Sequence, residues 1–243
     1  MTLLYNMNAS NIAQLLGTSS PEAVEDFVNG CTQETLSPEN KTYPDATYVN
    51  YHPLGLSFCY SSDSSTASSS RSLSYIDIFN PPASGRPARS RRKEAWFGFS
   101  PPSFPITFSF PSGNIPIPPA QHRAGEATSS GGTKDTLERN KTFEVGPKTT
   151  GKEFVDHFGE PSKKSAGEPG YVPPFLEWNS IDIVDGDGTV LPVGILIELR
   201  DPGVTEGMGG ARTETGATVW DRAGSWTWSS LKLFVPEKDG AMG

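Results

Sequence analysis

The loop from Gly146 to Lys152 is the segment whose residue types come closest to a known chemistry. It reads GPKTTGK and fits the G-x-x-x-x-G-K pattern, in which backbone amides and a lysine hold phosphate groups. It follows an apolar run and precedes a predicted helix, as a phosphate-binding loop does. Glu153, however, stands where such a loop needs a hydroxyl for magnesium, and a carboxylate there repels phosphate. Thr150 and Glu153 have the spacing of a helix capping box, so we interpret the segment as a helix start and keep nucleotide binding as the alternative.

Tryptophans gather in the C-terminal third of the chain and make up a candidate binding surface of Trp178, Trp220, Trp226 and Trp228. With Asp221 and Arg222 nearby, the last three would suit the stacking of a sugar ring against an indole. The alternative is packing in a core and at a sheet edge, which we favour. A sugar-active enzyme therefore stands beside the nucleotide-dependent enzyme as the second class of function.

A basic run interrupts an acidic chain. The formal net charge is -8, yet residues 86–93 read RPARSRRK, and their cations form a candidate interaction patch of Arg86, Arg89, Arg91, Arg92 and Lys93. The acidic balance elsewhere argues against nucleic-acid binding along the chain, because phosphate binding needs clustered Lys and Arg. We interpret the run as a solvated linker, with nuclear import or an acidic partner as alternatives. Ser90 and the Ser-rich stretch 61–72 are candidates for phosphorylation.

The sequence holds no set of residues with the spacing of a metal site or a catalytic triad. Cys31 and Cys59 are isolated, and the three histidines lie far apart. His157 neighbours Asp156, but adjacent helical residues point apart, and no nucleophile in a recognisable turn accompanies them. The segment 185–188 reads DGDG, lacks the glycine and glutamate positions of a calcium loop, and predicts a hairpin turn. We therefore expect no catalytic residue, no metal and no cofactor.

The elements that would position these residues begin with helices predicted at 11–16 and 20–29, each with apolar residues at helical spacing and a glycine at its end. The second helix starts with serine, proline and glutamate, which suit the cap, the first turn and the helix dipole. Runs with strand character follow at 48–51, 54–60 and 73–79, where alternation gives the strands one wetter face. The Ser-rich stretch between the last two runs is too polar to bury and predicts a mobile hairpin loop.

The rest of the chain predicts a linker and a second helix with strands. Residues 81–142 are rich in proline, glycine and serine, but they include an aromatic stretch at 96–110 that is rarely left in water. We expect this stretch to pack along the folded body in extended form, with its prolines excluding a central strand. A proline-rich ligand for an aromatic groove is the alternative. A helix is predicted at 150–158, with strands at 175–178, 193–199 and 226–235.

The same order of elements occurs twice, and short segments align between the copies: 24–27 with 155–158, 54–58 with 193–197, and 74–79 with 229–234. The offset grows only in loops, where insertions are tolerated. We therefore predict an α+β fold of two related modules, each a helix packed on a short antiparallel sheet, with Pro-, Ser- and Arg-rich loops between. The predicted boundaries are 1–80 for module one, 81–142 for the linker, 143–236 for module two and 237–243 for a tail.

In the second copy the helix ends at Gly159-Glu160-Pro161 and is followed by an aromatic strand, a strand led by a glycine and a closing strand. This pattern resembles the tandem modules of β-lactamase-inhibitor-protein-like and SmpA/OmlA-like proteins, and of mainly fungal hypothetical proteins with a duplicated version. The resemblance covers residues 8–80 and 143–236, and the first copy departs from it by lacking the Gly-x-Pro after its helix. It implies a non-catalytic surface that binds another protein, and it carries over no binding residue.

We therefore expect a protein-binding or scaffolding role, with another protein as the partner, no contact with a membrane, and no nucleic acid. The first residues lack a basic start followed by a long apolar run, and no stretch reaches the length of a membrane span. The expected compartment is the cytoplasm, where thiols stay reduced. The nucleus is the alternative if the basic run acts as an import signal.

Overall fold

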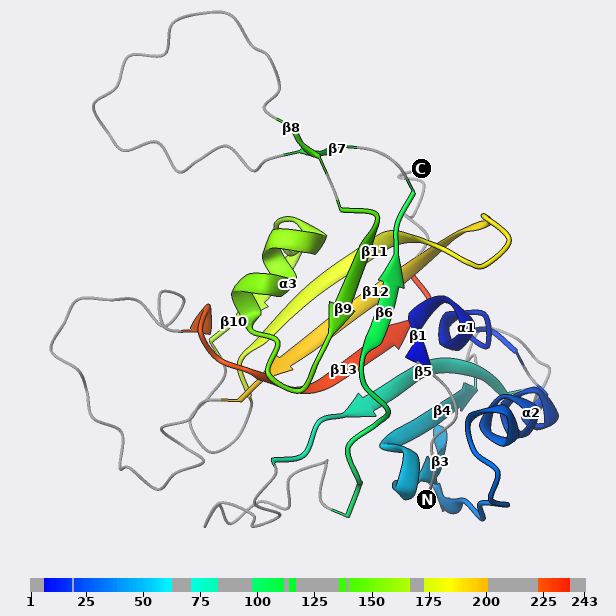
Figure 1. The fold of residues 1–243 in the computed structure, drawn as a ribbon. Coiled ribbons are helices and arrows are strands. Elements are labelled where there is room, and N and C mark those ends of the chain that lie inside the picture. Colours follow the sequence, from blue (N-terminus) through cyan, green and yellow to red (C-terminus); the bar gives the residue numbers. More distant parts are fainter. Residues whose placement is uncertain are drawn as a thin grey trace, which may run out of the picture.

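The computed structural model of the chain contains helices and strands in both its first and its last part (Figure 1). The helices are α1 (Ala9–Ala13), α2 (Pro21–Cys31) and α3 (Gly151–Phe158), with a short 3-10 helix, η1, at His52–Leu54. The described residues are 7–18, 20–62, 71–82, 98–111, 114–116, 136–138, 140–166, 173–200 and 223–236.

An eight-stranded sheet forms the centre of the molecule. Its strands are β2 (Glu39–Thr42), β3 (Ala46–Tyr51), β4 (Leu56–Ser62), β5 (Arg71–Phe79), β10 (Lys163–Ser165), β11 (Phe175–Val184), β12 (Val190–Leu199) and β13 (Trp228–Phe234). They lie in the order β10-β11-β12-β13-β5-β4-β3-β2, and every neighbouring pair is antiparallel. The predicted α+β class with antiparallel strands is therefore confirmed. β5 and β13 join the strands of the first part of the chain to those of the last part.

A three-stranded sheet packs on the large one. It consists of β1 (Met7–Asn8), β6 (Ile106–Ser109) and β9 (Thr142–Val145), with β6 in the middle, parallel to β1 and antiparallel to β9. The prediction that prolines exclude a central strand from the aromatic stretch is wrong. Pro105 and Pro111 stand just outside β6, so the strand keeps its own amides for pairing. A further pair, β7 (Asn114–Pro116) with β8 (Thr136–Glu138), is antiparallel.

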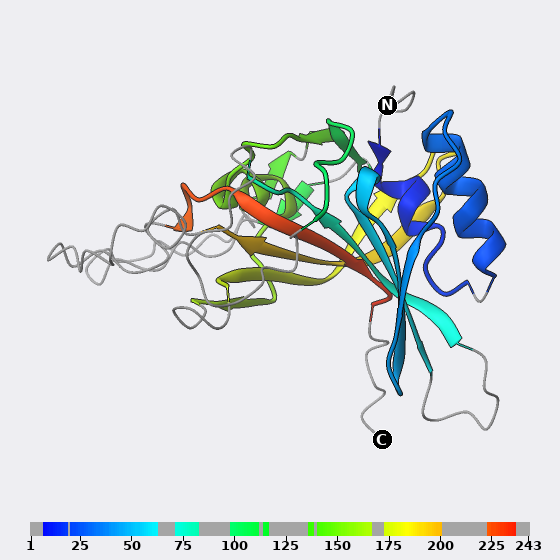
Figure 2. The same ribbon diagram turned by 90° about the horizontal axis from the view of Figure 1, so that it is seen from below.

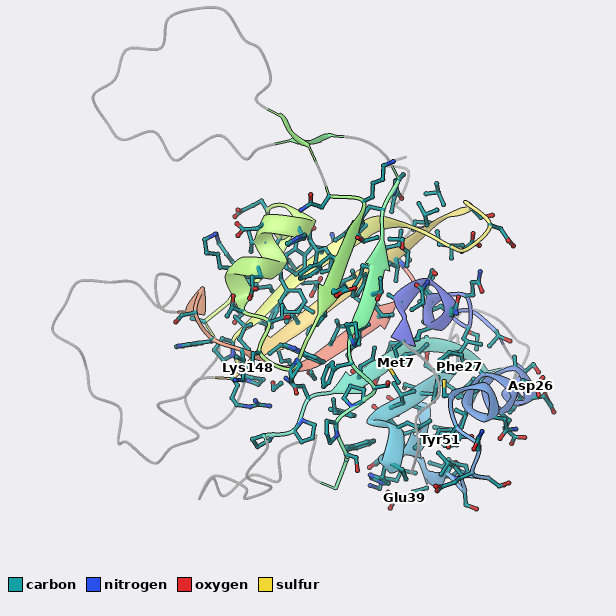
Figure 3. All side chains as sticks on the ribbon, viewed as in Figure 1. Met7, Asp26, Phe27, Glu39, Tyr51 and Lys148 are labelled. Atoms are coloured by element: carbon teal, nitrogen blue, oxygen red, sulfur yellow. The ribbon has the colours of Figure 1, made fainter. Side chains whose placement is uncertain are left out.

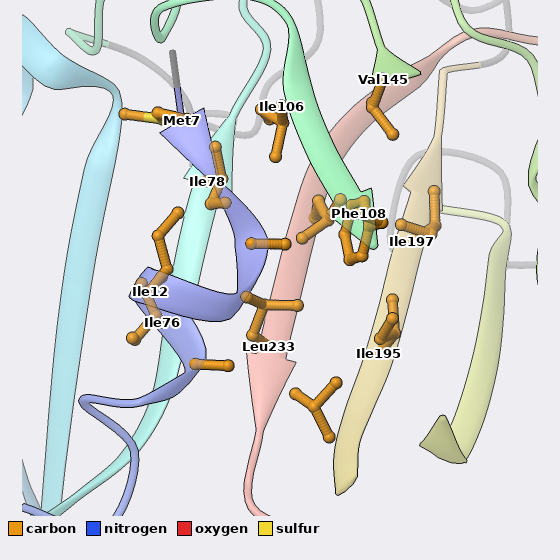
Figure 4. Close-up of a cluster of buried hydrophobic side chains, with 14 of the residues drawn as sticks. Met7, Ile12, Ile76, Ile78, Ile106, Phe108, Val145, Ile195, Ile197 and Leu233 are labelled. Atoms are coloured by element: carbon orange, nitrogen blue, oxygen red, sulfur yellow. The ribbon is translucent and has the colours of Figure 1, made fainter. Parts of the chain in front are cut away.

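The helices and the three-stranded sheet cover the same face of the eight-stranded sheet (Figure 2). Side chains from α1, β6 and β9 meet side chains from β5, β12 and β13 in one core (Figure 4), among them Ile12, Phe108, Val145, Ile76, Ile195 and Leu233. All six are fully buried. At about 25 cal/mol per Å² of apolar surface, this continuous core is the main source of stability.

Helix starts follow their sequence signals only in part. α3 has the predicted capping box: Thr150 Oγ1 accepts from the Glu153 amide, and Glu153 accepts from the Thr150 amide. At α2, by contrast, Ser20 makes no side-chain capping bond, and its hydroxyl donates to Glu22 at 2.6 Å. α1 begins earlier than predicted, because the Asn8 side chain accepts from the Ser10 amide and starts the helix at Ala9.

The predicted strand runs overlap β3, β4, β5, β11, β12 and β13, but the two outer strands were not predicted. The prediction that the first copy has a strand from Leu54 is wrong at its start: Leu54 ends η1 and Gly55 caps it with φ 70°, whereas Gly194, which aligns with Gly55, lies inside β12. β2 reads ENKT and is exposed along its whole length, and β10 reads KKS. Outer strands bury little apolar area, and charged residues at an edge protect it from pairing with other chains. Their sequences therefore carry no alternation from which a strand is recognised.

Among the described residues, no helix combines the length and the apolar character needed to cross a bilayer.

Candidate functional site on the helix-free face of the sheet

Five amides of the loop from Gly146 to Lys152 donate hydrogen bonds to other groups of the protein. These hydrogen bonds are 2.7–3.2 Å long, and the donors are the amides of Gly146, Thr149, Thr150, Gly151 and Lys152. Their acceptors include the Glu153 carboxylate and the Trp226 carbonyl. A phosphate-binding loop needs such amides free to face the ligand, so the hydrogen bonds argue against the nucleotide alternative.

The lysines of this loop are surface residues. Lys152 Nζ lies 2.5 Å from Asp156 Oδ2, one turn further along α3, and both side chains are at least half exposed. Lys148 is exposed at the N-terminal end of the same helix (Figure 3). An i,i+4 ion pair on a helix surface explains Lys152 without a ligand.

The described tryptophans are packing residues. Trp178, Trp226 and Trp228 are 3%, 6% and 0% exposed. The indole N–H donates to a backbone carbonyl at 3.0 Å from Trp178 and at 2.8 Å from Trp228. The candidate binding surface built on these three residues is therefore wrong, because indoles buried to this degree offer no face to a ligand. Trp220 lies outside the described residues.

The basic patch also lies outside the described residues, together with Ser90 and most of the Ser-rich stretch. The patch of Arg86, Arg89, Arg91, Arg92 and Lys93 stays a prediction.

The acidic turn and the histidine have structural roles. Asp185 Oδ1 accepts from the amides of Asp187 at 3.0 Å and Thr189 at 2.8 Å, which holds the predicted turn between β11 and β12. The His157 ring stacks on Phe143, with ring centres 4.0 Å apart. Within the described ranges, no cluster of His, Cys, Asp or Glu could hold a metal ion.

The sheet has a second face, which no described helix covers and which we call the helix-free face. Core residues of β4 and β5, such as Phe58 and Ile76, alternate with residues that point to this other face. Antiparallel register brings these together from neighbouring strands, and the resulting cluster comprises Tyr48, Cys59, Tyr75, Asp77, Lys232, Glu198 and Ser230.

A row of tyrosines crosses one end of this face. Tyr43 is 52% exposed and contacts Tyr48 edge to face, with ring centres 5.7 Å apart. Tyr48 in turn contacts Tyr75 with ring centres 6.3 Å apart, and the two hydroxyls are 2.8 Å apart. Cys59 lies on β4, between the strands that carry them, and is directly opposite both tyrosines in the strand register. The row presents aromatic edges and hydroxyl groups on a rigid sheet.

A charged pair lies beside the row at the centre of the sheet. Lys232 Nζ is 3.4 Å from Asp77 Oδ1 and 3.6 Å from the centre of the Tyr75 ring. The two side chains are 29% and 14% exposed. Burial raises the pKa of the Asp77 carboxyl to about 6. The positive charge of Lys232 lowers this pKa and the negative charge of Glu198 raises it, but burial has the largest effect.

No protein-family model, curated protein or solved structure matches this chain.

The function must therefore be argued from the geometry of this face. Burial raises the pKa of the Cys59 thiol and of the Tyr75 hydroxyl above their ordinary values. Both groups are protonated at neutral pH, and neither serves as a nucleophile or a base. At neutral pH these two groups offer hydrogen bonds rather than a nucleophile or a base.

The sequence indicates which residues point to this face but not which strands lie next to each other. Alternation in 56–62 and 71–79 indicates that Cys59, Tyr75 and Asp77 lie on the wetter sides of their strands. It does not indicate that β13 lies next to β5, which brings Lys232 from the far end of the chain to Asp77. The cluster depends on strand order, and short alternating runs do not specify strand order.

Proposed function

We propose that the chain is a duplicated helix-and-sheet module that binds another protein, without catalysis, through the helix-free face of its sheet. Two observations support the duplication and the binding role separately.

The duplication is supported by strand register. α2 followed by β2 to β5 has the same order as α3 followed by β10 to β13. Leu56 pairs with Ile78, and Ile195 pairs with Leu233. The sequence alignment of the two copies matches Leu56 with Ile195 and, separately, Ile78 with Leu233. The two pairs are therefore equivalent, although the alignment of one strand did not use the alignment of the other. Chance agreement in the order of elements does not produce matched register.

The binding role rests on one observation, the tyrosine row on a face without a described helix. Tyrosine supplies large contact area at low cost in side-chain entropy and is enriched at protein interfaces. A row fixed by ring contacts and by the bond between the Tyr48 and Tyr75 hydroxyls is preorganised for binding.

The charges of the face indicate which partner fits. Its lysines are paired with carboxylates across or along strands: Lys41 with Glu39, Lys163 with Glu177, and Lys232 with Asp77. A polyanion such as nucleic acid or an anionic membrane surface needs unpaired cations. The described face offers aromatic rings and compensated charge, which favour a protein surface of low net charge with apolar and hydrogen-bonding side chains.

The test compares two variants that each remove one exposed apolar side chain. Tyr43→Ser alters the row, and Val190→Ser is the matched control, since Val190 is 47% exposed at the start of β12. We expect the unaltered protein and Val190→Ser to retain the same binding partner, and Tyr43→Ser to weaken the purified complex by about tenfold or more. Equal affinity of all three for every captured partner would contradict the proposal.

A further inference from the structure

The joint between β5 and β13 has a register that is symmetric about one pair of residues. Asp77 stands opposite Lys232, and the flanking pairs are Ile78 with Leu231 and Ile76 with Leu233. The pair is thus the centre of the joint, with similar apolar residues on either side.

This symmetry creates an ambiguity that the apolar residues cannot resolve. If β5 paired in the same register with β5 of a second copy of the chain, Ile76 would face Ile78, which is again an apolar pair. If β13 paired with a second β13, Leu231 would face Leu233. All four side chains are fully buried, and isoleucine and leucine differ little in volume. The packing of these apolar side chains therefore does not distinguish the β5–β13 pair from a β5–β5 pair or a β13–β13 pair.

The central pair does distinguish them. In a β5 pair Asp77 would face the Asp77 of the second copy, and in a β13 pair two Lys232 side chains would face each other. Like charges directly opposite across strands are destabilising, and low exposure strengthens the effect. Asp77 is 14% exposed and has a second carboxylate, Glu198, close by. Only β5 with β13 places opposite charges at the centre.

We propose that Asp77 and Lys232 select β13 as the partner of β5 and exclude the pairing of β5 with β5, or of β13 with β13, of a second copy of this chain. The pair is a device for specificity, because it makes the incorrect joints more costly than the correct one. The inference depends on the β5–β13 register and not on the docking role of the helix-free face, so either can fail without the other.

The first experiment removes the charges without adding apolar surface. The double variant Asp77→Asn/Lys232→Gln is unfolded and refolded at increasing protein concentration, and its mass in solution is measured by light scattering. The matched control is Lys163→Gln/Glu177→Gln, which removes a cross-strand ion pair of 2.9 Å on the same sheet but away from the joint. We expect the dimer fraction to rise on the order of tenfold for the first variant only.

The second experiment separates specificity from lost stability. Asp77→Lys and Lys232→Asp are refolded alone and as a mixture, and native mass spectrometry counts the dimers. In the mixture, β5 of one chain and β13 of the other carry opposite charges, so mixed dimers should exceed self-dimers. Asp77→Lys/Lys232→Asp should be monomeric again. Mixed dimers no more abundant than self-dimers would overturn the inference, as would an Asp77→Asn/Lys232→Gln variant that refolds to the same monomer fraction as the unaltered protein.

Discussion

Asp77 and Lys232, which lie far apart in the sequence, face each other across the joint of the sheet with Nζ and Oδ1 3.4 Å apart. The ammonium is shared with the Tyr75 ring at 3.6 Å, so the carboxylate has only part of one cation to offset its burial. This imbalance accounts for the direction of its pKa shift, which is upward in spite of the lysine.

The first prediction concerns the pH dependence of stability. The pKa of Asp77 rises from 3.8 to about 6 on folding, so the folded protein binds this proton more tightly than the unfolded chain does. The free energy of unfolding should therefore fall as the pH rises from about 4 to about 6, and Asp77→Asn should be free of this loss. Between pH 4 and pH 7, we expect the free energy of unfolding of Asp77→Asn to rise relative to that of the unaltered protein by up to about 3 kcal/mol. Urea denaturation at each pH is the measurement.

The control for this prediction is Asp182→Asn, which removes one negative charge at an exposed position of β11. The prediction is contradicted if the difference in stability between Asp77→Asn and the unaltered protein is the same at every pH. Burial would then not destabilise the ionised carboxylate.

Local patterns predicted the elements of this fold better than their arrangement. Alternation in β4 and β5 and the capping box at Thr150 each have a cause within a few residues, and both occur as predicted. The central position of β6 was missed because Pro105 and Pro111 were read as interrupting the strand, whereas they bound it.

The candidate site was harder to predict than the fold, for a physical reason. Residues that stand out in the sequence, such as Lys152 and Trp228, are explained by a helix ion pair and by the core. Tyr48 and Lys232 have no local pattern, and they become neighbours of Tyr75 only through strand pairing. Long-range pairing is the part of the fold that a single sequence specifies least directly.

A second prediction concerns two glycines with different surroundings. A Cβ at Gly194 would collide with the Phe234 ring on the neighbouring strand, whereas nothing lies within 4 Å of a Cβ at Gly30 in α2. Gly194→Ala should lower the free energy of unfolding by about 1–3 kcal/mol through overpacking. Gly30→Ala should raise it by about 0.5–1 kcal/mol, because alanine is the better helix former. Thermal unfolding of both variants is the measurement, and equal shifts would contradict the close packing of Phe234 on Gly194.

A third prediction concerns the start of α3. Thr150→Ala should lower the free energy of unfolding by about 1 kcal/mol, because the capping bond from the Glu153 amide is lost. Lys152→Ala, which removes only an exposed ion pair, should change it by less than about 1 kcal/mol. Magnesium-ATP should shift the melting temperature of neither variant, nor that of the unaltered protein. A shift in the unaltered protein that is lost in Lys152→Ala would restore the nucleotide alternative.

A fourth prediction concerns the accessibility of the two thiols, which probes the helix-free face directly. Both cysteines are free and buried, and burial raises the pKa of Cys31 to about 11. At pH 8 about one thiol in a thousand with that pKa is ionised, so native Cys31 should be alkylated very slowly. Cys59 is 1% exposed and lies against the hydroxyls of Tyr48 and Tyr75.

If the tyrosine row shields Cys59, Tyr48→Ala should speed its alkylation by about tenfold or more while leaving Cys31 unchanged. Val49→Ala is the control, because Val49 is the next residue of β3 and packs against the core on the other face. Mass spectrometry of the labelled peptides separates the two sites. Faster labelling of both cysteines in Tyr48→Ala would mean that the variant unfolds more often as a whole, since only a local opening of the helix-free face reaches Cys59 alone.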